Sequence, residues 1–277
     1  MSTVLFDTPG PKALRRQRTA TVMAGLALAA LAGWVLWVLW DKEQITPEQW
    51  EPFTESNIVE LLYEGLIDTL AAAAVAIALA VAFGAVLASG RLSSHAVLRW
   101  PSVLVIEFFR AVPLLLLIFF LFLGFGGTLG TFWALVLGLM LYNGSVLAEI
   151  FRAGILSVPR GQSEAAYAVG MRKSQVMRLI LAPQAVRSML PAIISQCVVA
   201  LKDTALGFII GAPGIVRDAE RIYIAPQYDN PLAVGIVLAA IFIVINYSLS
   251  RLAVYLESRM RREGKPVIGT DAAATEG

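Results

Sequence analysis

Residues 111–148 read AVPLLLLIFFLFLGFGGTLGTFWALVLGLMLYNGSVLA, a stretch of 38 residues without a charged side chain. A helix needs about 20 apolar residues to cross the hydrocarbon core of a bilayer, so this stretch is too long for one span. The glycine-rich segment from Gly124 to Gly130 offers a natural break. We therefore predict two spanning helices here, from about Trp100 to Phe125 and from about Leu129 to Ile150.

Four further segments have the length and polarity of membrane spans. Thr19 to Trp40 and Thr69 to Gly90 each contain 22 residues without a charge. The other two run from about Ser188 to Ile210 and from Pro231 to about Tyr255. The sequence therefore predicts an all-α, polytopic membrane helical bundle of about six transmembrane helices.

The first of these segments could instead be a cleaved signal peptide, since Lys12, Arg15, Arg16 and Arg18 precede it. Its apolar core exceeds the roughly 7–15 residues of a signal-peptide core. It also ends in Trp34, Trp37 and Trp40 rather than in a small-residue cleavage site. These features favour an uncleaved spanning helix with an aromatic anchor at the membrane interface.

The composition excludes several classes of protein. The 277 residues are 58% hydrophobic and 15% charged, against roughly 45–50% and about 25% in soluble domains, which argues against a water-soluble globule. A single cysteine, Cys197, excludes a disulfide within the chain and a thiolate metal cluster, and a single histidine, His95, makes a histidine-based catalytic or metal centre improbable. The net charge of +2 is too small to suggest a nucleic-acid partner.

The positions of the basic residues predict the orientation, because cytoplasmic loops carry an excess of Lys and Arg. With both termini inside the cell, 17 of the 22 basic residues fall in cytoplasmic segments, and only Lys42, Arg217 and Arg221 fall outside. Arg110 and Lys202 remain, and both lie within predicted spans. We therefore expect a multi-pass protein of the cytoplasmic membrane with both termini in the cytoplasm.

This topology divides the chain into four parts. Residues 1–18 form a cytoplasmic N-terminal segment, and residues 19–60 form an additional transmembrane helix with an external linker. Residues 61–260 form the main transmembrane domain. Residues 261–277 are small and polar and predict a disordered cytoplasmic tail.

One polar segment, Phe151 to Arg187, is too long for a turn and too polar to span; it reads FRAGILSVPRGQSEAAYAVGMRKSQVMRLILAPQAVR. Residues from Ser163 to Val169 are compatible with a helix, Gly170 can end it, and Ser174 can start a second one. The small side chains of Ala165, Ala166 and Ala168 would let another protein approach closely. A solvated helical hairpin on the membrane surface is the alternative.

This loop resembles the EAA loop of the membrane subunits of ATP-binding-cassette (ABC) importers. Glu164, Ala165, Ala166 and Gly170 match EAAxxxG, and after nine residues Ile180 and Pro183 match IxLP, with Ala182 in place of the usual leucine. The flanking AEIFRAGILSVPRGQSEAA and APQAVRSMLP are similar to the polar amino-acid branch of these permeases. Two further segments are similar to motifs of that branch. FRAVP at 109–113 is similar to its FRGTP, departing at Ala111 and Val112, and KDTAL at 202–206 is similar to its KDTSL. Within that branch the whole chain looks most like the permease subunits of actinobacterial glutamate uptake systems.

The resemblance implies a type I ABC importer transmembrane domain and a permease subunit for a polar amino acid. Glutamate is favoured, and glutamine, aspartate or arginine are the alternatives. In such systems the EAA loop docks into a groove of a cytoplasmic ATPase, so Glu164, Ala165, Ala166 and Gly170 would couple transport to ATP hydrolysis. The implied partners are a second, similar permease subunit, two ATPase subunits and an extracytoplasmic amino-acid-binding protein.

By the same resemblance this chain is a transport subunit rather than an enzyme. It has no GxxxxGK[ST] phosphate-binding loop, so ATP and Mg²⁺ would be held by the ATPase and no cofactor or metal by this chain. The family core has five spans, so the helix before Asp41 is additional. We expect it to pack on the outside of the bundle or to anchor the subunit.

Ionisable groups inside a span are costly, so those present are candidates for the substrate pathway. Glu107 and Arg110 lie three residues apart and can pair on one helical face; Arg110 either fixes a neighbouring helix in this way or binds a substrate carboxylate. Lys202, Asp203 and Thr204 form a second polar group, either facing the pathway or packing against a helix. Tyr142, Asn143 and Glu149 form a third, in which Asn143 could simply hydrogen-bond a neighbouring helix.

The remaining polar features lie outside the spans. The outer segment Gly211 to Pro231, with Arg217, Asp218, Glu220 and Arg221, would receive the binding protein or be a solvated loop. His95 is expected to be solvated. A membrane-embedded hydrolase is disfavoured because the spans contain no histidine and no paired aspartates, and an ion-coupled secondary transporter would leave the EAA residues unexplained.

Overall fold

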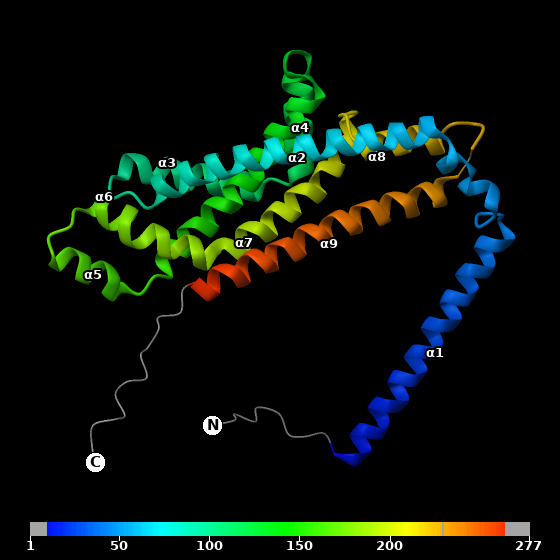
Figure 1. The fold of residues 1–277 in the computed structure, drawn as a ribbon, viewed down its shortest axis with the longest axis horizontal. Helices are drawn as coiled ribbons and strands as arrows, with labels where there is room; N and C mark the ends of the chain where they lie inside the picture. The colour runs from blue at the N-terminus through cyan, green and yellow to red at the C-terminus, as the bar shows by residue number, and fades with distance from the viewer. Residues whose placement is uncertain (1–9, 229, 264–277) are drawn as a thin grey trace.

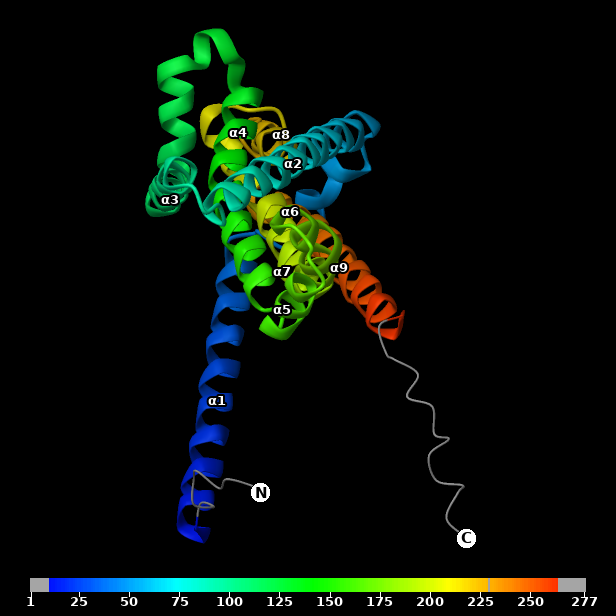
Figure 2. The ribbon, with the colours of Figure 1, turned by 90° about the vertical axis from the view of Figure 1, so that its left-hand side faces the viewer.

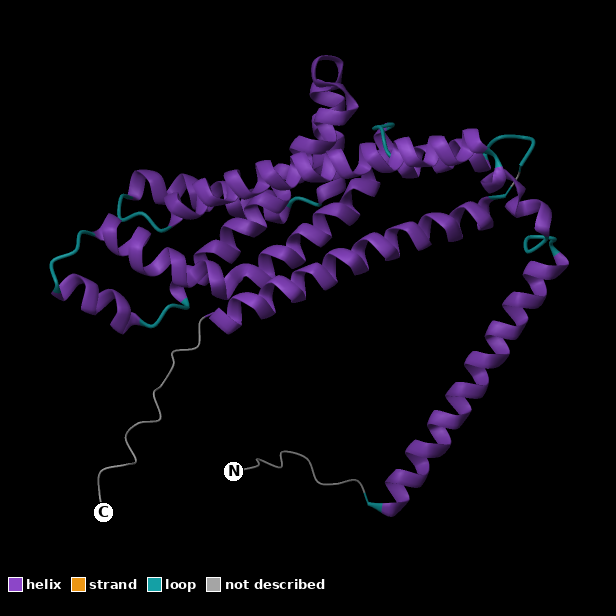
Figure 3. Ribbon diagram, in the orientation of Figure 1, coloured by secondary structure: helices purple, strands orange, loops and turns teal. Residues whose placement is uncertain are grey.

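The computed structural model describes residues 10–228 and 230–263, and these form helices joined by short turns, without a strand in the described residues (Figure 3). The predictions for residues 1–9 and 264–277 lie outside this range, whereas residues 261–263, predicted to be part of a disordered tail, belong to the last helix. The elements are α1 Pro11–Asp41, η1 Pro47–Thr54, α2 Ser56–Arg91, α3 Ala96–Ala111, α4 Leu114–Leu156, α5 Arg160–Ala168, α6 Lys173–Gln175, η2 Val176–Leu181, α7 Ala182–Asp203, η3 Thr204–Ile210, α8 Ile215–Tyr223 and α9 Pro231–Glu263.

Five helical segments of the described chain are long and apolar enough to cross a membrane: 12–41, 56–91, 114–156, 173–210 and 231–252. The predicted polytopic helical bundle is therefore confirmed. The count is five rather than the predicted six because two helices joined across a kink are counted together as the segment 114–156. Its interior residue Gly130 has φ 72° and ψ 166°, a conformation outside the helical region, and the chain turns back there (Figure 2). The predicted break between two helices in this region is thus present at Gly130.

The single helix predicted from Trp100 to Phe125 is wrong. Helix α3 ends at Ala111, Val112 is extended with φ −80° and ψ 128°, and α4 starts after Pro113. A proline disfavours the helical conformation of the residue before it, which accounts for the interruption at Val112. Arg110 therefore lies in the last turn of a short helix and not in the middle of a continuous span.

Small residues on α2 let it pack closely against α4. Ala72, Ala76, Ala80, Gly84 and Ala88 recur at every fourth position, and all five are buried. This spacing places them on one face of the helix, and small side chains there allow two helix backbones to approach. The main apolar core lies along this contact and is completed by residues of α4 and of the η3 turn.

The additional N-terminal helix α1 points away from the other helices (Figure 1), and none of its most apolar window is buried. Its predicted packing on the outside of the bundle is therefore wrong, because its apolar side chains contact no other helix extensively. Anchoring in the membrane stays a prediction.

The bounds of the last two predicted spans also differ from the structure. The fifth span was predicted to start at Ser188, but α7 begins at Ala182 and continues from η2. The sixth was predicted to end at about Tyr255, but α9 extends to Glu263.

Most of the segments that the charge distribution predicts to be cytoplasmic lie at one end of the bundle. Helices α5 and α6, the turn between α2 and α3, and the end of α9 gather there (Figure 1). The start of α1, which carries the first basic cluster, lies away from that end (Figure 1). The start of α2 and helix α8 lie toward the opposite end. This arrangement places the EAA residues far from the external segments.

Candidate functional site

The EAA residues lie on α5 and in the turn that follows it. Glu164 and Ala165 are exposed, whereas Ala166 is buried with 6% of its surface accessible. Helix α5 packs on the π-helical turn η2, and Gln184 of α7 donates from Nε2 to Gln162 Oε1 at 3.4 Å. The buried alanine thus holds α5 against the chain, while its neighbours face outward.

Gly170 ends α5 as the sequence predicts. Its φ is +83°, a value that favours glycine because a Cβ would clash with the backbone. The Gly170 N–H donates to Tyr167 O at 2.9 Å, and the Met171 N–H donates to Ala166 O at 3.1 Å. This pair of bonds is a Schellman motif, which satisfies the last carbonyl groups of the helix. The next helix starts at Lys173, one residue before the predicted Ser174.

Glu149 lies in a network of charges that joins α2, α3 and α4. Arg91 Nη1 lies 2.5 Å from Glu149 Oε1 and 3.1 Å from Glu107 Oε1. Arg152 donates from Nε and Nη2 to Glu149 Oε2 at 3.1 and 3.0 Å. The side chains of Arg91 and Glu149 are only 20% and 19% exposed, so these pairs are partly shielded from water. The network fixes the relative positions of three helices near the end of the bundle that carries α5.

The predicted pair between Glu107 and Arg110 is present, with Arg110 Nη1 3.7 Å from Glu107 Oε2. Glu107 lies closer to Arg91, however, and the Arg110 side chain is 41% exposed. Arg110 is therefore the looser member of the network. It is the one whose guanidinium could most readily exchange its partner for a carboxylate ligand.

Asn143 joins α4 to α7. It is 1% exposed, donates from Nδ2 to Leu139 O at 3.1 Å, and accepts from Gln196 Nε2 at 2.7 Å. The interpretation as a bond between helices is therefore confirmed for this residue. Its neighbour Tyr142 is half-buried.

Lys202, Asp203 and Thr204 lie where α7 passes into η3. Lys202 is exposed and Asp203 is half-buried, while Thr204 is buried and donates to Leu201 O at 2.6 Å. Within the described part of the chain, no hydrogen bond or ion pair connects these residues to the Glu149 network or to Asn143. The structure thus places the predicted pathway residues in three separate groups.

The end of the bundle that the basic residues predict to be external is held together by contacts between residues far apart in the sequence. Asp218 of α8 is buried and pairs with Arg221 Nη1 at 2.8 Å; burial raises the pKa of the Asp218 carboxyl, and the Arg221 charge opposes this. The Ile215 N–H donates to Thr69 Oγ1 at 2.9 Å, which ties α8 to α2. The Arg217 guanidinium donates to Gly211 O.

A second contact at this end joins η1 and the start of α2 to the segment before α9. The Tyr228 hydroxyl donates to the Glu55 carboxylate, 3.0 Å from each oxygen, which raises the pKa of Tyr228. Asn230 donates from Nδ2 to Gln49 O at 2.9 Å. The outer segment is therefore folded against the bundle.

Sequence reasoning missed Arg91 and Gln196 as site residues. Arg91 directly follows the uncharged run that ends at Gly90, so it lies at the end of a predicted span. A long basic side chain at such a position can reach a carboxylate on a neighbouring helix, and this was the signal for it. Gln196 was a polar residue in a predicted span, which is a weak signal. Among the described residues, no three His, Cys, Asp or Glu side chains lie close enough to hold a metal ion.

Comparisons with known proteins agree with this arrangement. Residues 51–262 match the family described as "Binding-protein-dependent transport system inner membrane component". The chain is 44% identical over 225 residues to the glutamate transport system permease protein GluD of Corynebacterium glutamicum, covering 79% of this chain and 82% of that protein. It is 32% identical over 210 residues to the glutamate/aspartate import permease protein GltK of Escherichia coli, covering 72% and 92%.

Solved structures show the same fold. A chain from a crystal structure of an amino acid ABC transporter with histidines has a TM-score of 0.68 at 32% identity, covering 73% of this chain and 94% of that one. An inward-facing MetNI methionine ABC transporter chain has a TM-score of 0.63 at 21% identity, covering 76% and 100%, and supports the fold alone. The matches confirm the resemblance carried by the EAA residues. The chain belongs to the family of binding-protein-dependent transport system inner membrane components.

Proposed function

We propose that this chain is a permease subunit of an ATP-driven importer that carries a polar amino acid, glutamate, across the cytoplasmic membrane. The observation that carries the proposal is the 44% identity to a glutamate permease over most of both chains. The similarity to a glutamate/aspartate permease supports an acidic substrate. Glutamine, aspartate and arginine are the competing substrates.

In this proposal α5 transmits the ATPase cycle to the bundle. Exposed Glu164 and Ala165 contact a groove of the ATPase, buried Ala166 transmits the displacement to η2, and the turn at Gly170 keeps α5 at a fixed angle. ATP and Mg²⁺ are bound and ATP is hydrolysed by two ATPase subunits. This chain is a transport subunit without a catalytic residue for hydrolysis.

The transport step is a rigid-body rocking of the helices. The chain pairs with a second permease subunit, and an extracytoplasmic binding protein delivers the amino acid to the end that carries α8. Arg110 and Lys202 are exposed cations that a substrate carboxylate can meet; Asp203 and Thr204 directly follow Lys202, and Tyr142 is a further polar group on α4. Both termini lie in the cytoplasm, as the basic residues predict.

The test is uptake of labelled glutamate by cells with and without this gene, with unlabelled amino acids as competitors. We expect uptake to depend on the gene and on the ATPase, and to be competed first by glutamate. Stronger competition by glutamine, aspartate or arginine would transfer the assignment to that amino acid. Uptake that persists after removal of the ATPase would instead indicate an ion-coupled secondary transporter.

The coupling role is tested at two glycines of one segment. Gly170→Ala forces an alanine into a left-handed conformation at a cost of about 1–2 kcal/mol, which reorients the turn. Gly161→Ala adds a methyl group where nothing lies within 4 Å, in helix α5, which the turn at Gly170 follows. We expect Gly170→Ala and Glu164→Gln to retain the assembled complex and lose ATP-driven uptake, while Gly161→Ala retains both. Unaltered uptake in Gly170→Ala and Glu164→Gln would refute the role of α5.

A further inference from the structure

A cavity of about 910 Å³ lies between α2, the end of α4, and the segment from α6 to α7. Its volume falls within the roughly 300–1,000 Å³ that is typical of sites for small ligands. None of the residues predicted for the substrate pathway lines it. The cavity is therefore separate from the residues predicted for the substrate pathway.

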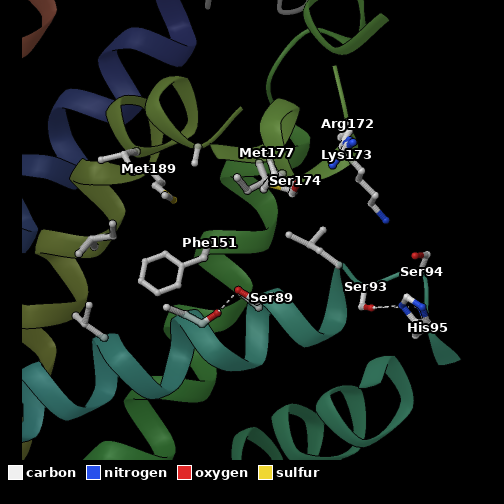
Figure 4. Close-up of a pocket in the computed structure, with 18 residues that line it drawn as sticks. Ser89, Ser93, Ser94, His95, Phe151, Arg172, Lys173, Ser174, Met177 and Met189 are labelled. Atoms are coloured by element: carbon white, nitrogen blue, oxygen red, sulfur yellow. Dashed lines mark hydrogen bonds between the residues drawn. The ribbon is translucent and has the colours of Figure 1, made fainter. Parts of the chain in front are cut away.

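The two ends of the cavity differ in polarity (Figure 4). Phe151, Met177 and Met189 line its interior, together with aliphatic residues of α2 and α7. Its mouth carries Arg172 and Lys173. This gradient, with cations at the water end and apolar walls at membrane depth, fits an amphiphile with an anionic head.

The polar groups at the mouth are available for a ligand. Arg172 and Lys173 are exposed, and within the described residues no carboxylate forms an ion pair with either of them. Ser93, Ser94 and His95, in the turn between α2 and α3, lie on the other side of the mouth. Ser93 Oγ already accepts from the His95 backbone N–H at 3.1 Å, and the Ser94 hydroxyl and the His95 imidazole can donate hydrogen bonds to phosphate oxygens alongside the two cations.

The lining also argues against an amino acid as the occupant. An α-ammonium group requires a carboxylate or free carbonyl partner, and no Asp or Glu is among the described lining residues. Basic pockets between transmembrane helices on the cytoplasmic side are typical binding sites for anionic phospholipids. The chemistry of the cavity matches that class of ligand.

We propose that this cavity binds an anionic phospholipid of the cytoplasmic leaflet. The phosphate contacts Arg172, Lys173 and the turn at His95, and an acyl chain lies against Phe151. The lipid joins the α2–α3 turn to the segment that directly follows α5. This proposal uses from the proposed function only the cytoplasmic placement of α5, and it stands or falls separately from the substrate assignment.

The experiment is native mass spectrometry of the assembled transporter with phosphatidylglycerol and with phosphatidylcholine. Each basic residue near an anionic lipid contributes about fivefold in affinity. We therefore expect Arg172→Gln/Lys173→Gln to weaken phosphatidylglycerol binding by about 25-fold. The control, Arg178→Gln/Arg187→Gln, removes the same charge from exposed residues of the same segment that do not line the cavity, and we expect a smaller change.

A second variant tests the apolar interior without changing the charge. Ala85→Phe places a ring in the cavity wall, and we expect it to exclude the acyl chain and lower phosphatidylglycerol binding. Three results would each overturn the proposal. They are binding of phosphatidylcholine as strong as that of phosphatidylglycerol, an equal loss of phosphatidylglycerol binding in both charge variants, and full displacement of the lipid by glycerol phosphate. Loss of the lipid when the ATPase binds would overturn it as well, because the mouth would then be a protein interface. Measuring glutamate uptake in parallel separates failure of this site from failure of the proposed function.

Discussion

Replacing Gly84 by alanine tests the close contact between α2 and α4. A Cβ added at Gly84 would lie 2.7 Å from Gly144 O, 3.0 Å from Leu147 Cβ and 3.2 Å from Ala148 N. Two of these three atoms belong to the backbone of α4 and cannot rotate away. The helices must therefore move apart along a contact that includes the main apolar core.

Two opposing effects determine the size of the change. Extra volume in a well-packed core costs about 1–3 kcal/mol, while alanine is more favourable than glycine inside a helix by about 1 kcal/mol. The matched control is Gly235→Ala in α9, where an added Cβ meets nothing within 4 Å and only the second effect remains. We therefore expect Gly84→Ala to be less stable than Gly235→Ala by about 1–3 kcal/mol.

The free energy of unfolding can be measured by titrating both variants with sodium dodecyl sulfate in mixed micelles, following tryptophan fluorescence. In transport, the same substitution should lower the amount of assembled complex and leave the uptake rate per complex unchanged. Equal stability of the two variants would refute the reasoning. It would mean that the backbones of α2 and α4 do not approach as closely as these distances state.

Three further predictions concern the polar contacts. The double-mutant cycle of Asn143→Ala and Gln196→Ala should give a coupling of about 0.6 kcal/mol and at most about 1.7, the range for hydrogen bonds between membrane helices, measured in the same titration. Arg91→Gln leaves the Glu149 carboxylate paired with Arg152 alone, so the loss of stability should exceed the roughly 0–1 kcal/mol of an exposed ion pair and fall short of the about 3–5 kcal/mol of a buried charge left without a partner. Asp218 should make stability depend on pH. The pKa of the Asp218 carboxyl is raised in the folded state, so the folded state binds more protons than the unfolded state. The free energy of unfolding therefore falls as the pH rises from about 4 through the raised pKa. Asp218→Asn should remove this fall in thermal unfolding scans at several pH values.

Each of these predictions has a control or a contradictory outcome. Strict additivity of the two single variants in the cycle would show that the bond between α4 and α7 contributes nothing. Arg99→Gln removes the same charge from an exposed residue of α3, so a loss equal to that of Arg91→Gln would contradict the network. A decline with pH of the same size in Asp218→Asn would assign the titration to another group.

The features that the sequence predicts correctly are those that depend on neighbouring residues. Uncharged stretches of spanning length predict helices because the backbone must satisfy its own hydrogen bonds in lipid. The break near Gly130 and the turn at Gly170 follow from glycine in conformations that other residues avoid. The EAA residues likewise lie within seven positions of one another, so their spacing identifies the family without any tertiary information.

The interruption at Val112 shows the limit of reading hydropathy alone. The segment from Trp100 to Phe125 is apolar enough for one span although it contains Pro113. The structure instead has two helices, with α3 packed on α2 and α4. Whether a proline kinks or ends a helix depends on what the flanking segments can pack against.

The roles of the polar residues were decided by the tertiary structure alone. Arg91 pairs with Glu107 and Glu149, and Asn143 accepts from Gln196, a residue 53 positions away. Hydropathy and motif spacing identify such residues as costly in a membrane, but they carry no information on which helices cross at that depth. The sequence by itself therefore determined the helical membrane class and the transporter family. Only the packing of α2, α3, α4 and α7 decided the partners of these charges and amides, because side chains distant in sequence meet only where their helices cross.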